Sequence, residues 1–441
     1  MTATDLAAAA ATAKAAGRLD EALKLYALAV TLQPDFIQAR LNLGNVLTAL
    51  DRPVDALLHY DLAIAQQPGY ALAHLAKAVA LTALNRHEDA IAAYDRALAI
   101  DPDFGAAEYG KALRLLQLGR YAEGWPLHEA HWRGAEPRPY PDTPYWTGVE
   151  PLAGKTVLVY AEQGLGDALQ FYRFVPELVA RGAKVILNVD PALRPLFVGR
   201  PEIDRLVTAG EKRPHFDYHV SLLSLPCALG TTLETMPGQA PYVFAPPDRV
   251  ATWAERLPKS RLRIGLVWSG NPGHSNDRNR SMPLSALGPL LEVEAEFVCL
   301  HAAVRDADRP SLAASSIVDL TGEIKDFADT AAIVSTCDLV ISVDTSVAHL
   351  AGAMGVAVWV LLPFSAEWRW MTERADSPWY PSAQLFRQGS PGDWAGLMSR
   401  ALRGPAARPR AGILLASHPG SNTSTSTQAT ELHVLPHRWP P

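Results

Sequence analysis

A repeated pattern of small and aromatic residues constrains the fold of the N-terminal third of this chain more than any other feature does. Alanine, tyrosine and proline return at equivalent places in three consecutive segments, with a constant step of 34 residues. Five series share this step: Ala10, Gly44 and Ala78; Ala22, Ala56 and Ala90; Tyr26, Tyr60 and Tyr94; Ala29, Ala63 and Ala97; Pro34, Pro68 and Pro102. Small residues let two helices approach closely, tyrosine fills the space beside them, and proline ends a helix. The pattern therefore predicts stacked helical hairpins.

The turn between the two helices of each hairpin repeats as well. A residue that tolerates a left-handed backbone precedes an arginine at Gly17, Asp51, Asn85 and Gly119. Together these features resemble the tetratricopeptide repeat, which has the same period. The predicted repeats are 3–36, 37–70, 71–104 and 105–134. The last repeat is atypical, because Gly124 and His128 stand where alanine and tyrosine are expected.

The periodicity changes after a linker, 135–153, that is rich in proline and aromatic residues. Apolar segments of strand length then alternate with helical segments, as in "TVLVYA", "DALQFYRFVPELVARG" and "AKVILNV". Such alternation predicts buried parallel sheets. The pattern lapses around 242–256 and restarts with "RIGLVWSG". We therefore predict an α-solenoid followed by two Rossmann-like α/β halves, 154–245 and 246–403, and a disordered tail, 404–441.

Composition narrows the function classes. The chain has 441 residues, a formal net charge of −6 and three widely separated cysteines. The charge gives no electrostatic reason to bind nucleic acid. Cys227, Cys299 and Cys337 each have apolar neighbours, which predicts buried free thiols in a reducing compartment. The sequence has neither a persuasive signal peptide nor an apolar run that could span a membrane, so we expect a soluble, cytoplasmic protein.

The loop "AEQGLGDALQ" follows the first predicted strand and contains Gly164 and Gly166. Leu169 occupies the third glycine position of the dinucleotide fingerprint, so the loop is a poor phosphate-binding motif. One interpretation is a tight turn with Asp167 in the first turn of a helix, where a carboxylate is favourable. The other is that Asp167, beyond the carboxyl end of a strand, acts as a general base.

A second candidate site lies in "VISVDTSVAHLAGAMG", where a buried strand ends at Asp344. Thr345 and Ser346 begin the following helix, and His349 lies in its first turn. Backbone N–H groups and two hydroxyls at the start of a helix suit a diphosphate, and the histidine can donate a hydrogen bond to it. An ordinary helix cap by Thr345 or Ser346 is the alternative interpretation.

The loop "WSGNPGHSNDRNRSM" is unusually long for a strand-to-helix connection, which favours a functional role. Its Arg278 and Arg280 can neutralise a phosphate or a sugar acid, although a solvated loop is the simpler alternative. Asp306 and Asp308 have the spacing of a metal-binding pair but lie in a loop that we expect to be solvated. We therefore expect no metal and no cofactor.

The segments "GLGDALQ", "DRNRSM", "DFADTA" and "DTSVAHLAGAMG" together resemble glycosyltransferases of the GT-B type, and most closely the heptosyltransferase-like family (glycosyltransferase family 9-like). With "AEGWPLHE", "SPWYP" and "LFRQ", the whole chain resembles bacterial proteins that join tetratricopeptide repeats to such a domain. The resemblance implies a nucleotide-sugar donor on the second half and an acceptor over the first half.

The resemblance also implies roles for individual residues. Gly166 and Asp167 match the glycine–aspartate pair of the heptosyltransferase first loop, in which the aspartate is the proposed base. Asp344, Thr345 and His349 match the segment that contacts the donor diphosphate. Ser346 replaces the glycine usual in that segment, so heptose is not implied as the sugar.

We therefore expect a cytoplasmic glycosyltransferase, with a protein acceptor bound by the concave surface of the repeats. Protein O-glycosylation, including modification of flagellin, is the reaction that the resemblance favours. Two alternatives stay open: a repeat scaffold that binds a nucleotide sugar without turnover, and a transferase that acts on a saccharide acceptor.

Overall fold

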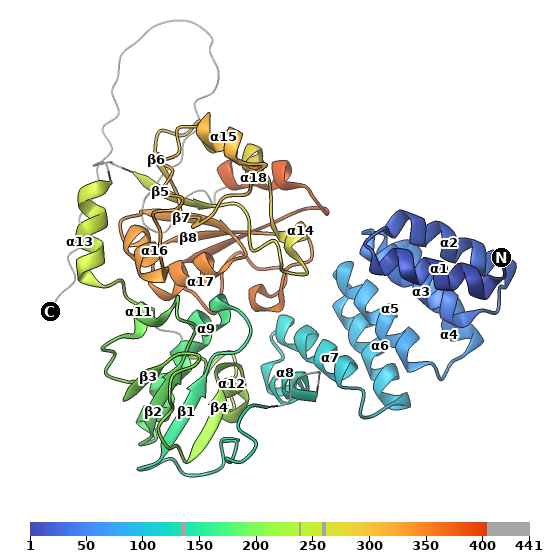
Figure 1. The fold of residues 1–441 in the computed structure, drawn as a ribbon, viewed down its shortest axis with the longest axis horizontal. Helices are drawn as coiled ribbons and strands as arrows, with labels where there is room; N and C mark the ends of the chain where they lie inside the picture. Colours follow the sequence, from blue (N-terminus) through green and yellow to red (C-terminus); the bar gives the residue numbers. More distant parts are fainter. Residues whose placement is uncertain (134–137, 238–239, 258–261, 404–441) are drawn as a thin grey trace, which may run out of the picture. The chain divides into compact units, whose positions relative to one another are not determined.

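The computed structural model describes residues 1–133, 138–237, 240–257 and 262–403 (Figure 1). The chain divides into two compact units. The first contains Met1–Gln239 and the segment Ser365–Trp379, and the second contains Ala240–Phe364 and the chain from Tyr380 onward.

This division differs from the predicted halves at two places. Residues 240–245 lie within the predicted first half, 154–245, but belong to the second unit. Ser365–Trp379 lies within the predicted second half, 246–403, but packs with the first unit. The boundaries of the predicted linker and halves stay predictions, and the predicted disordered tail, 404–441, lies outside the described residues.

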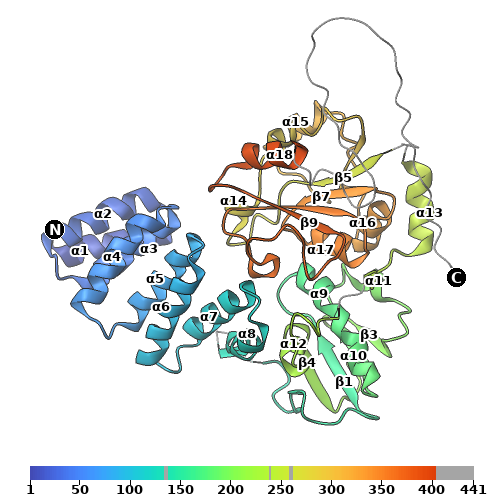
Figure 2. The same cartoon turned by 180° about the vertical axis from the view of Figure 1, so that it is seen from behind.

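The N-terminal part of the first unit consists of helices packed as successive antiparallel pairs (Figure 2). They are α1 (Ala3–Ala15), α2 (Leu19–Leu32), α3 (Ile37–Ala49), α4 (Pro53–Gln66), α5 (Ala71–Ala83), α6 (His87–Ile100), α7 (Gly105–Gln117) and α8 (Tyr121–His128), followed by the short 3-10 helix η1 (Glu129–Arg133). The predicted turn residues have left-handed backbones, with φ values of 74° at Gly17, 57° at Asp51, 57° at Asn85 and 79° at Gly119. The helical hairpins predicted from the 34-residue step are confirmed.

Close approach between paired helices explains the small residues of the repeat. A Cβ atom on Gly44 in α3 would lie 2.4 Å from the Tyr60 ring of α4. The Tyr60 hydroxyl donates to Asn45 Oδ1 at 2.9 Å and lies 3.1 Å from Thr48 Oγ1, so two residues of α3 fix the hydroxyl of this ring. The tyrosine thus fills the space that the small residue leaves.

The rest of the first unit is built on a parallel sheet with strand order β3-β2-β1-β4. The strands are β1 (Thr156–Tyr160), β2 (Lys184–Asn188), β3 (Arg205–Val207) and β4 (Tyr218–Ser221). The helices are α9 (Leu165–Phe171), α10 (Val175–Ala180), α11 (Arg194–Phe197) and α12 (Leu225–Ala228), with 3-10 helices η2 (Tyr172–Phe174) and η3 (Leu222–Ser224). Because β1 and β4 are neighbours, Tyr160 and Ser221 pair where both strands end.

The second unit has a parallel sheet with strand order β6-β5-β7-β8-β9. Its strands are β5 (Arg263–Val267), β6 (Glu296–Cys299), β7 (Leu339–Val343), β8 (Val358–Leu362) and β9 (Ala383–Arg387). Its helices are α13 (Pro247–Arg256), α14 (Asp277–Arg280), α15 (Arg309–Ala313), α16 (Phe327–Val334), α17 (Ser346–Ala353) and α18 (Trp394–Arg403), and its 3-10 helix is η4 (Leu284–Leu287). A further 3-10 helix, η5 (Trp368–Trp370), lies in the segment that packs with the first unit.

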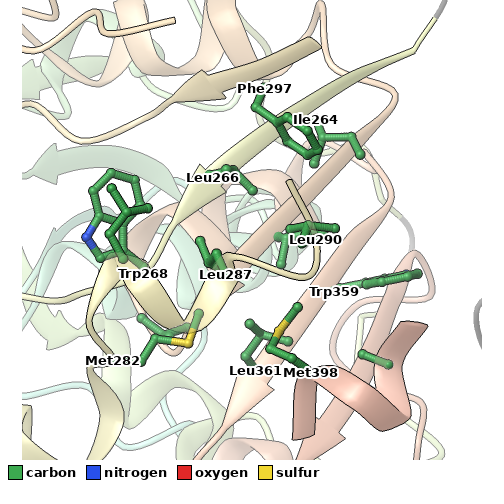
Figure 3. Close-up of a cluster of buried hydrophobic side chains, with 14 of the residues drawn as sticks. Ile264, Leu266, Trp268, Met282, Leu287, Leu290, Phe297, Trp359, Leu361 and Met398 are labelled. Atoms are coloured by element: carbon green, nitrogen blue, oxygen red, sulfur yellow. The ribbon is translucent and has the colours of Figure 1, made fainter. Parts of the chain in front are cut away.

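Alternate residues of the strands fill the core of the second unit. Figure 3 shows Ile264 and Leu266 of β5, Trp359 and Leu361 of β8 and Met398 of α18 in one buried cluster. Every residue of β5, β7 and β8 is buried, so both faces of these strands are covered. This explains their continuous apolar sequences. The predicted fold class, a helical solenoid followed by two parallel α/β halves, is confirmed.

Two expectations drawn from composition can be compared with the structure. No helix among the described residues combines the length and the hydropathy that a membrane crossing requires. Cys299 and Cys337 are buried as expected, but the prediction is wrong for Cys227, which is only partly buried. Leu225 and Pro226 fill the buried side of its short helix, α12.

The contact between Gly44 and Tyr60 yields a test of the repeat packing. Gly44→Val should destabilise α3 and α4 by about 1–3 kcal/mol, because overpacking forces the ring to move. Amide hydrogen exchange of the two helices in the full chain measures this change. Gly69→Val is the matched control, since a Cβ atom there meets nothing within 4 Å. Equal effects of the two substitutions would refute the packing argument.

Candidate active site

In the loop after β1, the Asp167 side chain accepts a hydrogen bond from the backbone of the same loop. Gly164 caps α9, and its N–H donates to Asp167 Oδ2 at 2.8 Å. Gly164 has an extended backbone and Gly166 is helical, whereas Gln163 carries the left-handed φ of 61°. The tight turn with a carboxylate in the first helical turn, one of the two interpretations of this loop, is therefore what the structure contains.

Arg369 holds the second oxygen of this carboxylate. Its Nη2 donates to Asp167 Oδ1, its Nη1 to Glu367 Oε1 at 2.5 Å and its Nε to Gln170 Oε1 at 2.7 Å. The guanidinium carbon lies 4.5 Å from the centre of the Trp368 ring. Burial lowers the pKa of Arg369, but the Asp167 and Glu367 carboxylates outweigh burial and raise it. Both oxygens of Asp167 are thus engaged, and the carboxylate has a structural role.

The segment that supplies Arg369 is anchored among aromatic side chains of the first unit. Trp368 lies 5.5 Å from Trp125 of α8, and Trp379 lies 5.7 Å from Phe171 of α9, measured between ring centres. The segment follows β8 in the sequence, far from the loop that it contacts. No spacing or motif connects Arg369 with Asp167, so the sequence analysis missed it.

In the second unit, the carboxyl ends of β5 and β7 carry the other predicted residues. Helix α17 begins at Ser346 directly after β7, with Thr345 as its cap. Thr345 makes no side-chain capping bond within the described part of the chain, because its hydroxyl lies 3.0 Å from Ser342 Oγ instead. The first N–H groups of α17 are therefore not capped by Thr345, which weakens the ordinary-cap interpretation.

Arg280 reaches this helix from the long loop after β5. Its Nη1 donates to the carbonyl oxygen of Asp344 at 3.1 Å. Its Nε is buried and has no hydrogen-bond partner among the described residues. A Cβ atom on Gly270 would lie 2.7 Å from Nη2, so the glycine gives the guanidinium room. A cation thus stands beside the amino end of α17.

The loop that carries Arg280 is held rigidly. Asp277 accepts from Ser281 Oγ at 2.8 Å and from Arg305 Nη2 at 2.5 Å. Gly270 N–H donates to the same serine hydroxyl at 2.9 Å. These bonds fix the base of the loop, which the alternative interpretation of a solvated loop does not require, while Arg278 lies exposed on α14.

His349 is buried in the first turn of α17. Its Nδ1 lies 2.9 Å from the Tyr380 hydroxyl, and its Nε2 lies 3.9 Å from Asp344 Oδ1. A Cβ atom on Gly352 would lie 2.4 Å from the Tyr380 ring. Tyr380 is a residue that the sequence analysis missed, and the small residues of "AHLAGAMG" were the signal for a large side chain packed on this helix.

Asp306 and Asp308, which have metal-like spacing, are expected in a solvated loop, and this expectation is wrong for Asp308. Asp308 is buried, accepting from Trp268 Nε1 at 3.0 Å and from the Leu284 N–H at 3.0 Å. The Trp268 N–H donates to His301 Nε2 at 3.2 Å. Burial lowers the pKa of His301 to about 4, so the neutral ring accepts this bond. Asp306 is exposed, 3.3 Å from Arg309.

The structure therefore brings five predicted residues together around the start of α17, and the other predicted residues lie outside this group. The gathered residues are Arg280, Asp344, Thr345, Ser346 and His349, all in the second unit. Asp167, Gly164 and Gly166 form the loop of the first unit.

Comparison with known families identifies the N-terminal part. Two family models, both described as tetratricopeptide repeat, match residues 7–71 and 71–104. The N-terminal helices are tetratricopeptide repeats. The atypical repeat formed by α7 and α8 lies beyond these two matches.

A curated relative matches a longer part of the chain than the two family models do. Protein FlbA of Caulobacter vibrioides (strain ATCC 19089 / CIP 103742 / CB 15) is 28% identical over 310 residues, which is 63% of this chain and 51% of that protein. The chain therefore spans about half the length of the curated relative that it matches.

Two solved structures resemble parts of the chain. A glycosyl transferase family 9 structure from Veillonella parvula is 12% identical, with a TM-score of 0.43, and covers 55% of this chain and 88% of its own. A thermophilic tetratricopeptide-repeat protein of Thermus thermophilus is 20% identical, with a TM-score of 0.29, and covers 32% of this chain and 76% of its own. Neither likeness bears on the activity of this chain.

The contacts of Arg369 generate a second prediction. Arg369→Met should lower the free energy of unfolding by about 3–5 kcal/mol, because it leaves the Asp167 carboxylate partly buried without its cation. Denaturant unfolding with hydrogen exchange of α9 measures this loss. Arg374→Met, which breaks a more exposed pair with Asp376 in the same segment, should cost about 1 kcal/mol or less.

A double-mutant cycle separates the pair from other effects of the substitution. The loss caused by Arg369→Met should shrink in an Asp167→Asn background, since the neutral amide no longer needs a cation. An undiminished loss would show that the ion pair does not hold this segment in place.

Proposed function

We propose that the chain is a glycosyltransferase that moves a sugar from a nucleotide-sugar donor to an acceptor recruited by the repeats. The donor diphosphate binds to the second unit without a metal ion, because a helix amino end and a guanidinium supply the positive charge. The acceptor binds to the first unit. The reaction takes place in the cytoplasm.

The observation that carries this proposal is the arrangement at the amino end of α17. The Thr345 side chain does not cap the first N–H groups of that helix, and Arg280 donates to the Asp344 carbonyl beside them. N–H groups at a helix start with a neighbouring arginine form an anion site suited to a diphosphate. His349 lies in the first turn of α17 and is held by a hydrogen bond with the Tyr380 hydroxyl. It donates a hydrogen bond to the diphosphate oxygen that leaves the sugar.

The transfer step needs a proton acceptor on the acceptor side. The acceptor hydroxyl oxygen forms a bond to the anomeric carbon, and the bond from that carbon to the diphosphate oxygen breaks, leaving its electron pair on the diphosphate. Asp167 takes the hydroxyl proton. Its contact with Arg369 orients the carboxylate, and Gly164 fixes its other oxygen.

Donor binding is tested by removing the guanidinium. Arg280→Met should weaken binding of UDP, GDP, ADP or dTDP, whichever the protein binds, by about 10-fold or more, because a charge-assisted bond is lost. Isothermal titration calorimetry measures the affinity. Arg309→Met, at an exposed arginine of the same unit, is the control and should leave the affinity unchanged. Equal affinities of wild type and Arg280→Met would remove Arg280 from the donor site.

The proposed base is tested by Asp167→Asn. Transfer should fall by about 100-fold or more, because the amide cannot take the proton. The affinity for the nucleoside diphosphate should stay unchanged. Glu177→Gln, a partly exposed carboxylate on α10 of the same unit, is the matched control. Unchanged transfer would exclude Asp167 as the base.

The acceptor is proposed to be a protein, with O-glycosylation of a flagellin-type protein as one possibility. Mass spectrometry of proteins from cells with and without this chain tests the assignment. A glycan mass that disappears from one protein would identify sugar and acceptor together. A mass lost from a polysaccharide instead would support the saccharide-acceptor alternative.

One observation favours a second candidate function, a non-catalytic repeat scaffold. Both oxygens of Asp167 are engaged in structural contacts. Calorimetry with the four nucleoside diphosphates separates the candidates, since binding of none of them would favour a scaffold.

A further inference from the structure

A second carboxylate, Glu162, lies at the edge of the first sheet with partners from two other elements. Ser221 Oγ donates to Glu162 Oε1, and His131 Nε2 lies 3.3 Å from the same oxygen. The Glu162 side chain is 15% exposed and that of His131 is 10% exposed. These groups therefore form a largely buried polar cluster that the proposed donor site does not use.

The fold places these three residues together although they are distant in sequence. Glu162 follows the carboxyl end of β1, and Ser221 is the last residue of the neighbouring strand β4. His131 belongs to η1, directly after α8 of the atypical last repeat. The repeats thus contribute a side chain to the edge of the sheet at which ligands of α/β domains bind.

His131 is arranged as a cation for this carboxylate. Its Nδ1 lies 2.6 Å from the His128 carbonyl oxygen, which accepts a hydrogen bond from it, while its Nε2 faces Glu162. Burial lowers the pKa of His131, but the bond and charge of Glu162 and the carbonyl of His128 outweigh burial and raise it. The ring therefore favours the form that donates from both nitrogens.

Two neighbouring tyrosines connect the cluster with its surroundings. The Tyr160 hydroxyl is buried and has no hydrogen-bond partner among the described residues, which points to a ligand or solvent group beside it. The Tyr109 ring lies 6.0 Å from the His131 ring, measured between ring centres. Glu162 and Asp167 both follow β1, Glu162 before helix α9 and Asp167 in its first turn, so the cluster and Asp167 are parts of one region.

We propose that Glu162, held in place by His131 of the last repeat, is a binding subsite for a neutral, hydroxyl-bearing acceptor group. A hydroxyl of the acceptor other than the one that attacks the sugar donates to the carboxylate of Glu162. The subsite rests on the proposed transferase function, because it recognises the acceptor whose proton Asp167 takes. Glu162 is the residue that touches the acceptor, and His131 is a positioning residue.

The geometry differs from that of a hydrolytic triad. The Ser221 hydroxyl bonds to Glu162 and not to the histidine, so the serine–histidine contact of such a triad is not formed. Its oxygen also accepts from the Leu223 N–H at 3.1 Å. The serine therefore fixes the carboxylate instead of acting as a nucleophile.

Steady-state kinetics of the full chain tests the subsite, with the donor found in the nucleotide panel and unglycosylated acceptor from cells lacking the chain. Glu162→Gln should raise the acceptor KM by about 10-fold, because a bond to a charged group is weakened. Both kcat and donor hydrolysis in the absence of acceptor should stay unchanged, since uniform binding is what is lost. Glu177→Gln is the matched control.

His131→Gln is a second variant that tests the same subsite if Glu162→Gln does not fold. It should raise the acceptor KM without changing kcat, and the double variant should be no worse than Glu162→Gln alone, because both act through one carboxylate. His74→Gln, at an exposed histidine of α5, is its control.

The outcomes distinguish the two proposals. An unchanged acceptor KM in both variants, with an active wild type, would overturn the subsite and leave the transferase intact. A drop in kcat and donor hydrolysis together would also overturn it, since that is the signature of a general structural defect. A wild type that neither hydrolyses nor transfers any donor would overturn the proposed function and the subsite with it.

Discussion

A buried guanidinium is the interaction on which the arrangement of the first unit depends. Arg369 comes from a segment between β8 and β9, yet it binds Asp167, Gln170 and Glu367 and stacks on Trp368. Two carboxylates offset the cost of burying its charge. One side chain thereby fixes both the start of α9 and the path of Ser365–Trp379.

Packing around small residues sets the other constraint. The repeats need a small residue opposite each tyrosine, as Gly44 and Tyr60 illustrate, because helices in contact cannot accommodate both a side chain and a ring. The same rule applies in the second unit, where the missing side chain of Gly352 leaves space for the Tyr380 ring. The Tyr380 hydroxyl in turn forms a hydrogen bond with His349. Residues without side chains thus position residues that carry chemistry.

The two sheet edges have different electrostatic character. At the carboxyl ends of β5 and β7, the start of helix α17 and Arg280 offer positive potential to an anion. At the carboxyl ends of β1 and β4 lie two carboxylates, Asp167 bound by Arg369 and Glu162 bound by His131, with each partner from another element. A donor diphosphate suits the first edge and a neutral hydroxyl suits the second, which is the division that the proposed transfer requires.

The sequence by itself determined the repeats, their turns and the parallel α/β halves, because these depend on periodic burial and on local backbone preferences that neighbouring residues encode. It also led to the prediction of Arg280, Thr345 and His349 as donor-site residues, since strand ends and helix starts are local signals. Only the tertiary structure decided that Arg369 engages Asp167 and that His131 engages Glu162. Those pairs join residues far apart in the chain, and no period or spacing records a contact made by folding.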